Sequence, residues 1–444
     1  MKNVFYWSIV AALAGLLFGF DTVVISGADK KLQTLWESTD TFHGFVVMGM
    51  ALWGTVVGAL FGAFPTQRLG RKTTLFWIGV LYTFSAGGSA LANDPFIFAL
   101  FRFIGGLGVG ISTIAAPAYI SEIAPPKNRG RLVGLYQFNL VFGILLAFLS
   151  NYALSDIGDN AWRWMMGVEA FPAIIFTILC LTIPQSPRWL ITQGKLEKAK
   201  SIYTLIAPEG SFERLVQEIN QSGTTKNKSE SIFNIKYRFP LKLAFLVAFF
   251  NQLSGINAFL YYAPRIFEEG GLGESTSLLS SVGIGVTNLV FTCVGISLID
   301  KKGRRNLMYY GSFGYIISLS LVACAFFFEW GGLMIPIFLF LFIASHAIGQ
   351  GAIIWVYISE IFPNHLRNSG QAFGTSVHWV LAAIIPSFVP LLFGAIGAGV
   401  VFSIFAGFMV LQLVFVHFMM PETKGISLEE LSHKLISDKK NSKK

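Results

Sequence analysis

Hydrophobic residues recur along the chain in runs of about 20 residues, separated by short polar segments. At about 1.5 Å per residue, a helix of this length spans a hydrocarbon core of about 30 Å. The pattern therefore predicts an all-α membrane protein with twelve transmembrane helices. We place them at residues 4–27, 44–64, 73–92, 96–119, 132–154, 165–183, 241–263, 277–299, 307–328, 333–357, 370–394 and 398–420.

Composition supports a lipid rather than an aqueous environment. The chain of 444 residues is 54% hydrophobic and 13% charged, whereas soluble domains carry about 25% charged residues. Its three cysteines, Cys180, Cys293 and Cys324, all fall inside predicted spans, where cysteine acts as a small apolar residue. We therefore expect neither a disulfide framework nor a metal site.

Basic residues are distributed unevenly between the two sides of the predicted helices. With both termini in the cytoplasm, 28 of the 33 Lys and Arg residues lie on that side, as the positive-inside rule requires. The net charge of +9 then reflects membrane topology and attraction to anionic lipid. It gives no reason to expect nucleic acid as a partner.

A polar stretch at residues 185–240 divides the chain into a first six-helix half, 1–184, and a second, 241–420, followed by a cytoplasmic tail, 421–444. Within this linker, residues 195–207 and 212–221 have helical periodicity with charged faces. We expect two short amphipathic helices there, lying under the membrane surface.

Short motifs repeat between the two halves. YISEI at 119–123 returns at 357–361, GRK at 70–72 returns as GRR at 303–305, and PQSP at 184–187 is echoed by PETK at 421–424. The offsets are 238, 233 and 237 residues. Because each half holds an even number of spans, the repeat predicts two six-helix halves related by a pseudo-twofold axis along the membrane normal, with the substrate between them.

Three ionisable residues lie deep inside predicted spans of the first half: Asp21, Arg102 and Glu169. Such residues cost several kcal/mol unless they are paired or face a wet cavity. They are consistent with a proton site, in which Arg102 favours ionised Asp21 and Glu169 opposes it. They are equally consistent with a static buried ion pair that fixes helix packing, and the residues alone leave both alternatives open.

A second set consists of amides and aromatic residues within the spans. Amides both donate and accept hydrogen bonds, as sugar hydroxyls require, and aromatic faces cover the apolar side of a sugar ring. Hydrogen bonds between helices are the ordinary alternative, but the number of amides beside tryptophans favours a sugar site. The set comprises Gln137, Asn251, Gln252, Asn257, Tyr261, Tyr262, Asn288, Trp355, His378 and Trp379. Gly255, among the amides, predicts an interrupted helix.

A third set lies at the cytoplasmic ends of the spans. Its members are Arg68, Arg71, Glu122, Arg129, Arg304, Glu360 and Arg367. These residues have two possible roles. They can be basic groups that set the membrane topology, or they can form a latch that closes one side of a transporter. Because a glutamate stands at the same place in both halves, we favour a cytoplasmic gate.

The glycine run at 105–110 does not follow a strand, and no Gly-Lys-Ser/Thr sequence follows it, so we expect close helix packing there rather than a phosphate loop. We find no nucleotide-binding motif, no catalytic constellation and no metal-ligand spacing. The sequence therefore predicts no enzyme activity and no cofactor.

Seven motifs over essentially the full length resemble those of the sugar porters of the major facilitator superfamily. They are GFDTVVISG at 19–27, RLGRK at 68–72, PAYISE at 117–122, PQSPRWL at 184–190, QLSGIN at 252–257, GRR at 303–305 and PETKG at 421–425. The chain looks most similar to bacterial proton-coupled xylose and hexose symporters and more distantly similar to animal glucose facilitators. The resemblance implies the major facilitator fold.

The resemblance also implies roles for individual residues. Asp21 matches the proton-coupling aspartate, Arg102 its partner and Glu169 the neighbouring acid, which favours proton symport. The sugar-binding positions are matched by Gln137, Gln252, Asn257, Asn288, Trp355 and Trp379, with Phe18 and Gly351 lining the same pocket and Tyr262 at the outer gate. Asn251 and His378 depart from the family's residues within the pocket, and Gln67 and Gln185 depart from its cytoplasmic motifs.

Together these features predict a secondary transporter that imports a pentose or hexose with protons by alternating access. We expect it to act as a monomer in a lipid bilayer, the bacterial inner membrane, with sugar and protons as its partners. An uncoupled sugar facilitator is the main alternative, and a transporter-like sugar sensor is a lesser one.

Overall fold

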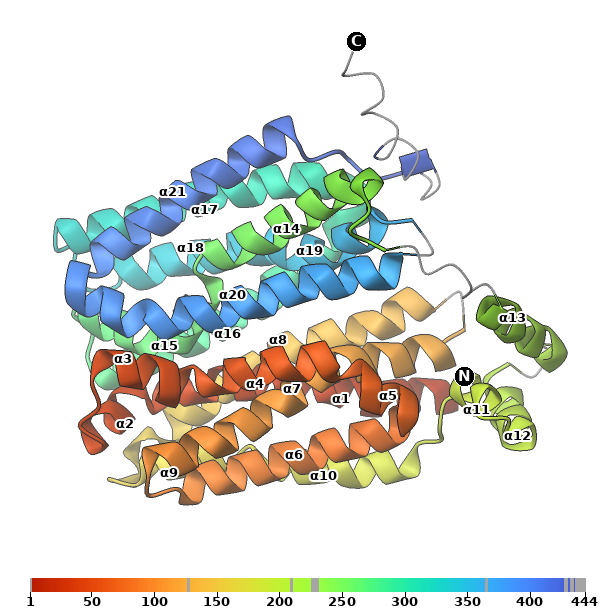
Figure 1. Cartoon of the computed structure of the whole chain (residues 1–444). Helices are drawn as coiled ribbons and strands as arrows, with labels where there is room; N and C mark the ends of the chain where they lie inside the picture. The colour runs from red at the N-terminus through yellow and green to blue at the C-terminus, as the bar shows by residue number, and fades with distance from the viewer. Residues whose placement is uncertain are drawn as a thin grey trace, which may run out of the picture. The chain divides into compact units, whose positions relative to one another are not determined.

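The described part of the chain is helical. A computed structural model describes residues 2–125, 128–207, 211–224, 231–363 and 366–426, together with Glu430, Leu431 and Leu435. Within these ranges every regular element is an α-, 3-10 or π-helix and there is no strand, so the predicted all-α class is confirmed (Figure 1). Parts of the predicted linker, residues 208–210 and 225–230, and most of the predicted tail lie outside the described residues.

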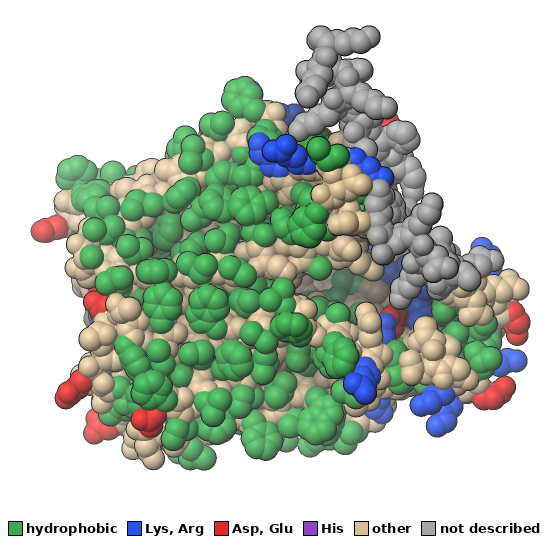
Figure 2. Space-filling view, viewed as in Figure 1, with side chains coloured by type: hydrophobic (Ala, Val, Ile, Leu, Met, Phe, Trp, Pro, Cys, Tyr) green, Lys and Arg blue, Asp and Glu red, His purple; other side chains and the backbone are tan. Residues whose placement is uncertain are grey.

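The helices have the length and apolarity of membrane spans. Among the described residues, 11 helices meet both requirements, and the pair Asp40–Met48 and Met50–Phe61, bent by 42°, supplies a twelfth span. Hydrophobic side chains cover much of the visible face, while charged ones lie toward the helix ends (Figure 2). Phe84, Leu91 and Phe171 are 64%, 78% and 71% exposed, which suits contact with lipid rather than water. With the bent pair counted as one span, the number of candidate spans equals the twelve predicted.

Two compact units make up the chain, and we describe each by itself. Unit 1 comprises Met1–Ile25 and Met50–Ser229, and unit 2 comprises Ser26–Gly49 and Glu230–Lys444. The α-helices of unit 1 are α1 Lys2–Val24, α4 Met50–Phe61, α5 Ala63–Arg68, α6 Arg71–Leu91, α7 Pro95–Ile123, α8 Arg129–Leu154, α9 Ala161–Gly167, α10 Ala170–Thr182, α11 Pro187–Thr192, α12 Leu196–Ile206 and α13 Phe212–Thr224.

Unit 2 contains the second group of spans and a segment from between the first two. Its helices are α2 Asp29–Leu35, α3 Asp40–Phe42, η2 His43–Met48, α14 Arg238–Leu253, α15 Ile256–Glu269, α16 Glu274–Lys302, α17 Arg304–Phe327, α18 Met334–Ile348, α19 Gln350–Glu360, α20 Arg367–Ile396 and α21 Ala398–Phe418. The short 3-10 helix η1, Ile25–Gly27, joins α1 to this unit. Residues Ser26–Gly49 therefore pack with helices that lie more than 180 residues later in the chain.

Small residues allow the helices of unit 1 to pack backbone against backbone. A Cβ atom on Gly106 of α7 would lie 1.9 Å from the carbonyl oxygen of Ala51 in α4. One on Gly19 of α1 would lie 1.9 Å from the carbonyl oxygen of Leu140 in α8. Since no side chain fits at these distances, the predicted packing role of the glycine run is confirmed.

Two spans of unit 2 are interrupted. Gly255 separates α14 from α15 with a φ of +82°, a left-handed conformation that disfavours residues with a Cβ. Tyr262, inside α15, has non-helical angles of φ −120° and ψ 18°. Gly349 divides α18 from α19. The interruption predicted around Gly255 is confirmed.

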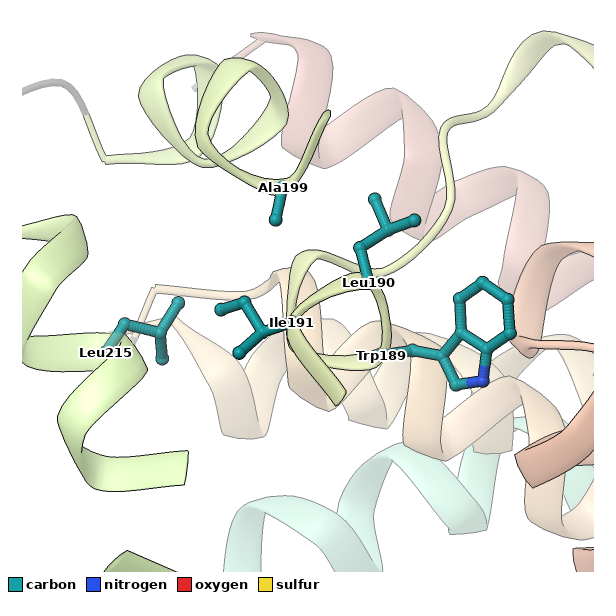
Figure 3. Packing of buried hydrophobic residues seen from close by; sticks show 5 residues of the cluster. All are labelled: Trp189, Leu190, Ile191, Ala199 and Leu215. Carbon is teal, nitrogen blue, oxygen red and sulfur yellow. The ribbon is translucent and has the colours of Figure 1, made fainter. Parts of the chain in front are cut away.

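The linker folds into three short helices with a core of their own. Trp189, Leu190 and Ile191 of α11 pack with Ala199 of α12 and Leu215 of α13 (Figure 3). The helices α12 and α13 lie where the two short helices at 195–207 and 212–221 are predicted.

Candidate functional site

The three ionisable residues of the first half come together inside unit 1. Arg102 of α7 donates from Nη1 to the Asp21 carboxylate at 2.5 Å and from Nη2 to the Asp21 carbonyl oxygen at 2.9 Å. Both side chains are 1% exposed. Gly105, one turn along α7 from Arg102, allows close packing beside this contact, because a Cβ there would lie 2.3 Å from the Ser85 hydroxyl oxygen and 3.3 Å from the Asp21 carboxylate.

Glu169 lies beside this pair, at the break between α9 and α10. Its side chain is 1% exposed, and it interacts electrostatically with both Asp21 and Arg102. Its carboxyl group also lies within hydrogen-bonding range of the Asp21 side chain. The arrangement places two buried carboxyl groups near one guanidinium. Adding or removing one proton there changes the net charge of the cluster and therefore the strength of its ionic contacts.

The polar residues of unit 2 form a second cluster around Gln252 of α14. Its amide nitrogen donates to the Asn251 side chain at 3.0 Å and lies 3.2 Å from Nδ1 of His378 in α20. Its amide oxygen accepts from Asn257 of α15 at 2.9 Å. The other ring nitrogen of His378 lies 3.3 Å from the same amide nitrogen. Because an amide nitrogen only donates, a ring nitrogen of His378 is the acceptor in this contact.

Aromatic rings surround this cluster. The His378 ring lies 4.9 Å from Trp355 of α19 and 5.0 Å from Trp379, between ring centroids. These residues and the amides are therefore neighbours in the fold although they come from four helices. Together they offer hydrogen-bond donors, acceptors and aromatic faces, the combination that binds a sugar.

The remaining predicted pocket residues come from α15, α16 and unit 1. Asn288 of α16 accepts from Thr292 at 3.3 Å, and Tyr262 is fully buried at the kink of α15. Phe18 of α1 and Gln137 of α8 belong to unit 1.

His346 of α18 is a polar residue of this region that the sequence analysis missed. A Cβ on Gly351 would lie 3.2 Å from the His346 ring, and the ring's Nδ1 is 2.5 Å from the Tyr315 hydroxyl. His346 also interacts electrostatically with His378. From the sequence, His346 could have been found by its position five residues before the predicted pocket residue Gly351, across the break at Gly349.

Among the residues of the predicted gate, an arginine at the start of one helix pairs in each unit with a glutamate at the end of another. Arg71 at the start of α6 donates to Glu122 at the end of α7 at 2.8 Å, and Arg304 at the start of α17 donates to Glu360 at the end of α19 at 2.8 Å. Arg367 begins α20, and Arg129 begins α8 with an exposed side chain.

The internal repeat is visible around these pairs. Gly70 and Gly303 precede α6 and α17 with φ of +87° and +88°. Gln185 accepts from the Lys72 backbone N–H at 3.1 Å, and Glu422 accepts from those of Arg304 and Arg305 at 2.9 and 3.0 Å. In each unit a side-chain oxygen thus accepts a hydrogen bond from the backbone at the start of a helix. The amide of Gln185 does so in unit 1 and the carboxylate of Glu422 in unit 2.

Comparison with known proteins gives these clusters a context. Residues 7–435 match the family model described as "Sugar (and other) transporter". The chain belongs to the sugar transporter family. It is 36% identical to the arabinose-proton symporter of Bacillus subtilis over 96% of this chain and 93% of that protein. It is 31% identical to the glucose facilitated diffusion protein of Zymomonas mobilis, over 97% of each chain.

Solved structures of the sugar transporter family have the same fold. The inward-open xylose transporter XylE of Escherichia coli is similar with a TM-score of 0.86 and 32% identity, over 96% of this chain and 99% of that one. The sequence resemblance and the major facilitator fold are thereby confirmed. This protein is a multi-pass membrane transporter, not an enzyme.

Proposed function

We propose that this sugar transporter imports a monosaccharide, a pentose or a hexose, together with protons and by alternating access. The observation that carries the proposal is the buried pair of Asp21 and Arg102 with Glu169 beside it. Ionisable groups inside membrane spans are costly and typically mark ion and proton pathways. The name of the arabinose-proton symporter supports the same assignment.

In this mechanism the proton acts on the contact between Asp21 and Arg102. Deprotonated Asp21 holds Arg102 through its carboxylate and its carbonyl oxygen, which keeps the helices α1 and α7 locked and resists return of the empty carrier. Protonation of Asp21 removes its charge and releases Arg102, so the helices rearrange when sugar is bound. Glu169 assists because a second carboxyl group gives Arg102 an alternative partner.

The sugar site in this proposal combines amides, aromatic rings and a histidine. The hydrogen-bonded group around Gln252 supports it, since its members already meet in the fold. The residues that we assign to sugar binding are Phe18, Gln137, Asn251, Gln252, Asn257, Tyr262, Asn288, Gly351, Trp355, His378 and Trp379, with Tyr262 also acting at the outer gate. His346 joins this set through its place beside Gly351.

The ion pairs at the cytoplasmic helix ends are proposed to act as the inner gate. Buried or half-buried pairs that separate and re-form give a transporter two discrete states. The pairs Arg71–Glu122 and Arg304–Glu360 support this role. The full set assigned to the gate is Arg71, Glu122, Arg129, Arg304, Glu360 and Arg367.

We propose that the protein lies in the bacterial inner membrane as a monomer, with both termini in the cytoplasm. The distribution of Lys and Arg between loops supports this orientation. The functional halves are residues 1–184 and 241–420, connected by the linker 185–240 and followed by the tail 421–444.

Proton movement in proteoliposomes tests the proposal. A pH-sensitive dye reports external alkalinisation when D-xylose, L-arabinose or D-glucose is added to wild type and to Asp21→Asn. We expect sugar-dependent alkalinisation in wild type and none in the variant. An Asp21→Asn protein that still accumulates sugar against its gradient overturns the proton-coupling role.

Uncoupled facilitated diffusion is the second candidate function. It is favoured by the 31% identity to the glucose facilitated diffusion protein of Zymomonas mobilis. In the same assay, a facilitator admits sugar without moving protons, and Asp21 and Arg102 then form a structural pair.

A further inference from the structure

A second buried ionic cluster lies in unit 2, and the proposed transport mechanism does not use it. Asp29 of α2 is 2% exposed. One of its carboxylate oxygens is 2.8 Å from Nε of Arg265 in α15, and the other is 2.6 Å from Nε2 of His43 in η2. The carboxylate thus joins two basic side chains from different elements.

Further polar contacts extend this cluster across the segment Ser26–Gly49. Gln33 accepts a hydrogen bond from Arg265 through its amide oxygen and donates to Asp40 at 2.8 Å through its amide nitrogen. The Ser38 hydroxyl lies 3.4 Å from the other ring nitrogen of His43. Through these contacts α2, α3 and η2 are all connected to α15.

The two segments that the cluster joins, α15 and Ser26–Gly49, each lie at an interruption of a helical span. On the α15 side, Arg265 lies three residues beyond the kink at Tyr262, and its guanidinium carbon is 5.8 Å from the centre of the Tyr262 ring. On the other side, the span that includes η2 bends by 42° next to Gly49. The cluster therefore fixes residues 263–269, which we call the outer half-helix, to a segment that has its own bend.

The chemistry of the cluster suits a contact that opens. Apolar packing of similar volume stabilises a fixed interface at least as well as buried charges do. Charged groups, in contrast, are readily solvated when an interface separates, whereas apolar groups resist exposure. A buried charge that loses its partner without reaching water is strongly unfavourable, so the cluster has two discrete states, closed or hydrated.

We propose that Asp29, His43 and Arg265 are positioning residues of the outer gate. They hold the outer half-helix, and through it Tyr262, against the segment Ser26–Gly49 while the outside is closed, and they separate when the transporter opens outward. This inference rests on the proposed alternating access, and it assigns to the outer side an ionic latch in addition to the proposed cytoplasmic pairs.

Accessibility to a membrane-impermeant maleimide tests the latch without any sugar. Ala263, fully buried on the outer half-helix, becomes the outer reporter as Ala263→Cys. Ser121, half-buried at the cytoplasmic end of α7, becomes the inner reporter as Ser121→Cys. The native cysteines are replaced in this background by Cys180→Ala, Cys293→Ser and Cys324→Ala.

The variants Asp29→Asn and Arg265→Gln are expected to raise the labelling rate of the outer reporter at least about tenfold, because the closed state loses its differential stabilisation. The labelling rate of the inner reporter is expected to fall by a similar factor, since the inner side of the transporter closes when the outer side opens. His43→Gln, which retains a hydrogen-bonding side chain, is a milder variant that keeps the test possible if the others do not fold. Its rates are expected to change in the same directions.

The matched control is Lys30→Ala. Lys30 pairs with Glu268 at 2.6 Å and joins the same two helices, α2 and α15, but its side chain is 46% exposed. We expect less than about a twofold change, because exposed pairs contribute little.

Three outcomes overturn the proposal: unchanged labelling in all three latch variants, faster labelling of both reporters, or an equal effect of the Lys30 control. Faster labelling of both reporters would indicate a loosened fold rather than a gate. Because the labelling is done without substrate, failure of the latch is distinguishable from failure of proton-coupled sugar transport, which the dye assay measures.

Discussion

The contact between Asp21 and Arg102 leads to a quantitative prediction. Both side chains are 1% exposed, and Arg102 makes two hydrogen bonds to Asp21. Removing one partner of a buried pair costs about 3–5 kcal/mol, because the other charge stays buried without compensation. We therefore expect Arg102→Gln to lower the free energy of unfolding by about that amount, and Asp21→Asn to lower it less, because Glu169 remains beside Arg102 as a second carboxyl group.

The double variant should be much more stable than the sum of the two changes suggests. With both charges gone, the desolvation penalty disappears together with the attraction, so the cycle should give a coupling energy of about 1.5–3 kcal/mol. The assay is unfolding in mixed micelles by titration with sodium dodecyl sulfate, followed by tryptophan fluorescence.

The exposed pair of Arg214 and Glu218 is the control for this cycle. Its atoms are 3.5 Å apart, and its side chains are 81% and 53% exposed. Its coupling energy should not exceed about 0.5 kcal/mol. Equal coupling in the two cycles, or additive effects at Asp21 and Arg102, would refute the reasoning from burial.

Two further predictions concern packing and the sugar site. Gly106→Ala should abolish folded protein in size-exclusion chromatography, because its Cβ would lie 1.9 Å from a backbone oxygen, whereas Gly87→Ala, with nothing within 4 Å, should elute as wild type; normal elution of Gly106→Ala contradicts the packing argument. His378→Leu should raise the KM of sugar uptake by about 5- to 150-fold, because Gln252 loses a buried acceptor, while His378→Gln should raise it less. Equal KM values for the two variants would count against that hydrogen bond.

Much of the fold was predictable because membrane helices follow simple rules. Length and apolarity identify spans, and the break at Gly255 was predictable because glycine stands among amides within an apolar run. The bend beside Gly49 was not, because the run from 44 to 64 has no proline and no polar break to indicate it. The assignment of Ser26–Gly49 to unit 2 could not be predicted from the sequence either, since it depends on contacts between residues distant in sequence.

Pairings were predictable where the repeat or the scarcity of charge limited the choices. Arg102 was the natural partner of Asp21, because few other charges lie inside the spans, and the ion pairs Arg71–Glu122 and Arg304–Glu360 follow from repeated motifs. Asp29 and His43, by contrast, lie in a polar stretch where charges are common. Only the fold shows that they are buried against Arg265.

The membership of Ser26–Gly49 in unit 2 bears on how the protein can be divided and recombined. A gene fragment that ends within the linker encodes the first six spans together with a piece whose partners, Arg265 among them, are encoded by the other fragment. The two fragments are therefore not interchangeable modules. Exchanging second halves between homologous transporters should succeed only when residues 26–49 are exchanged with them, so the natural boundary for chimaeras is discontinuous in sequence.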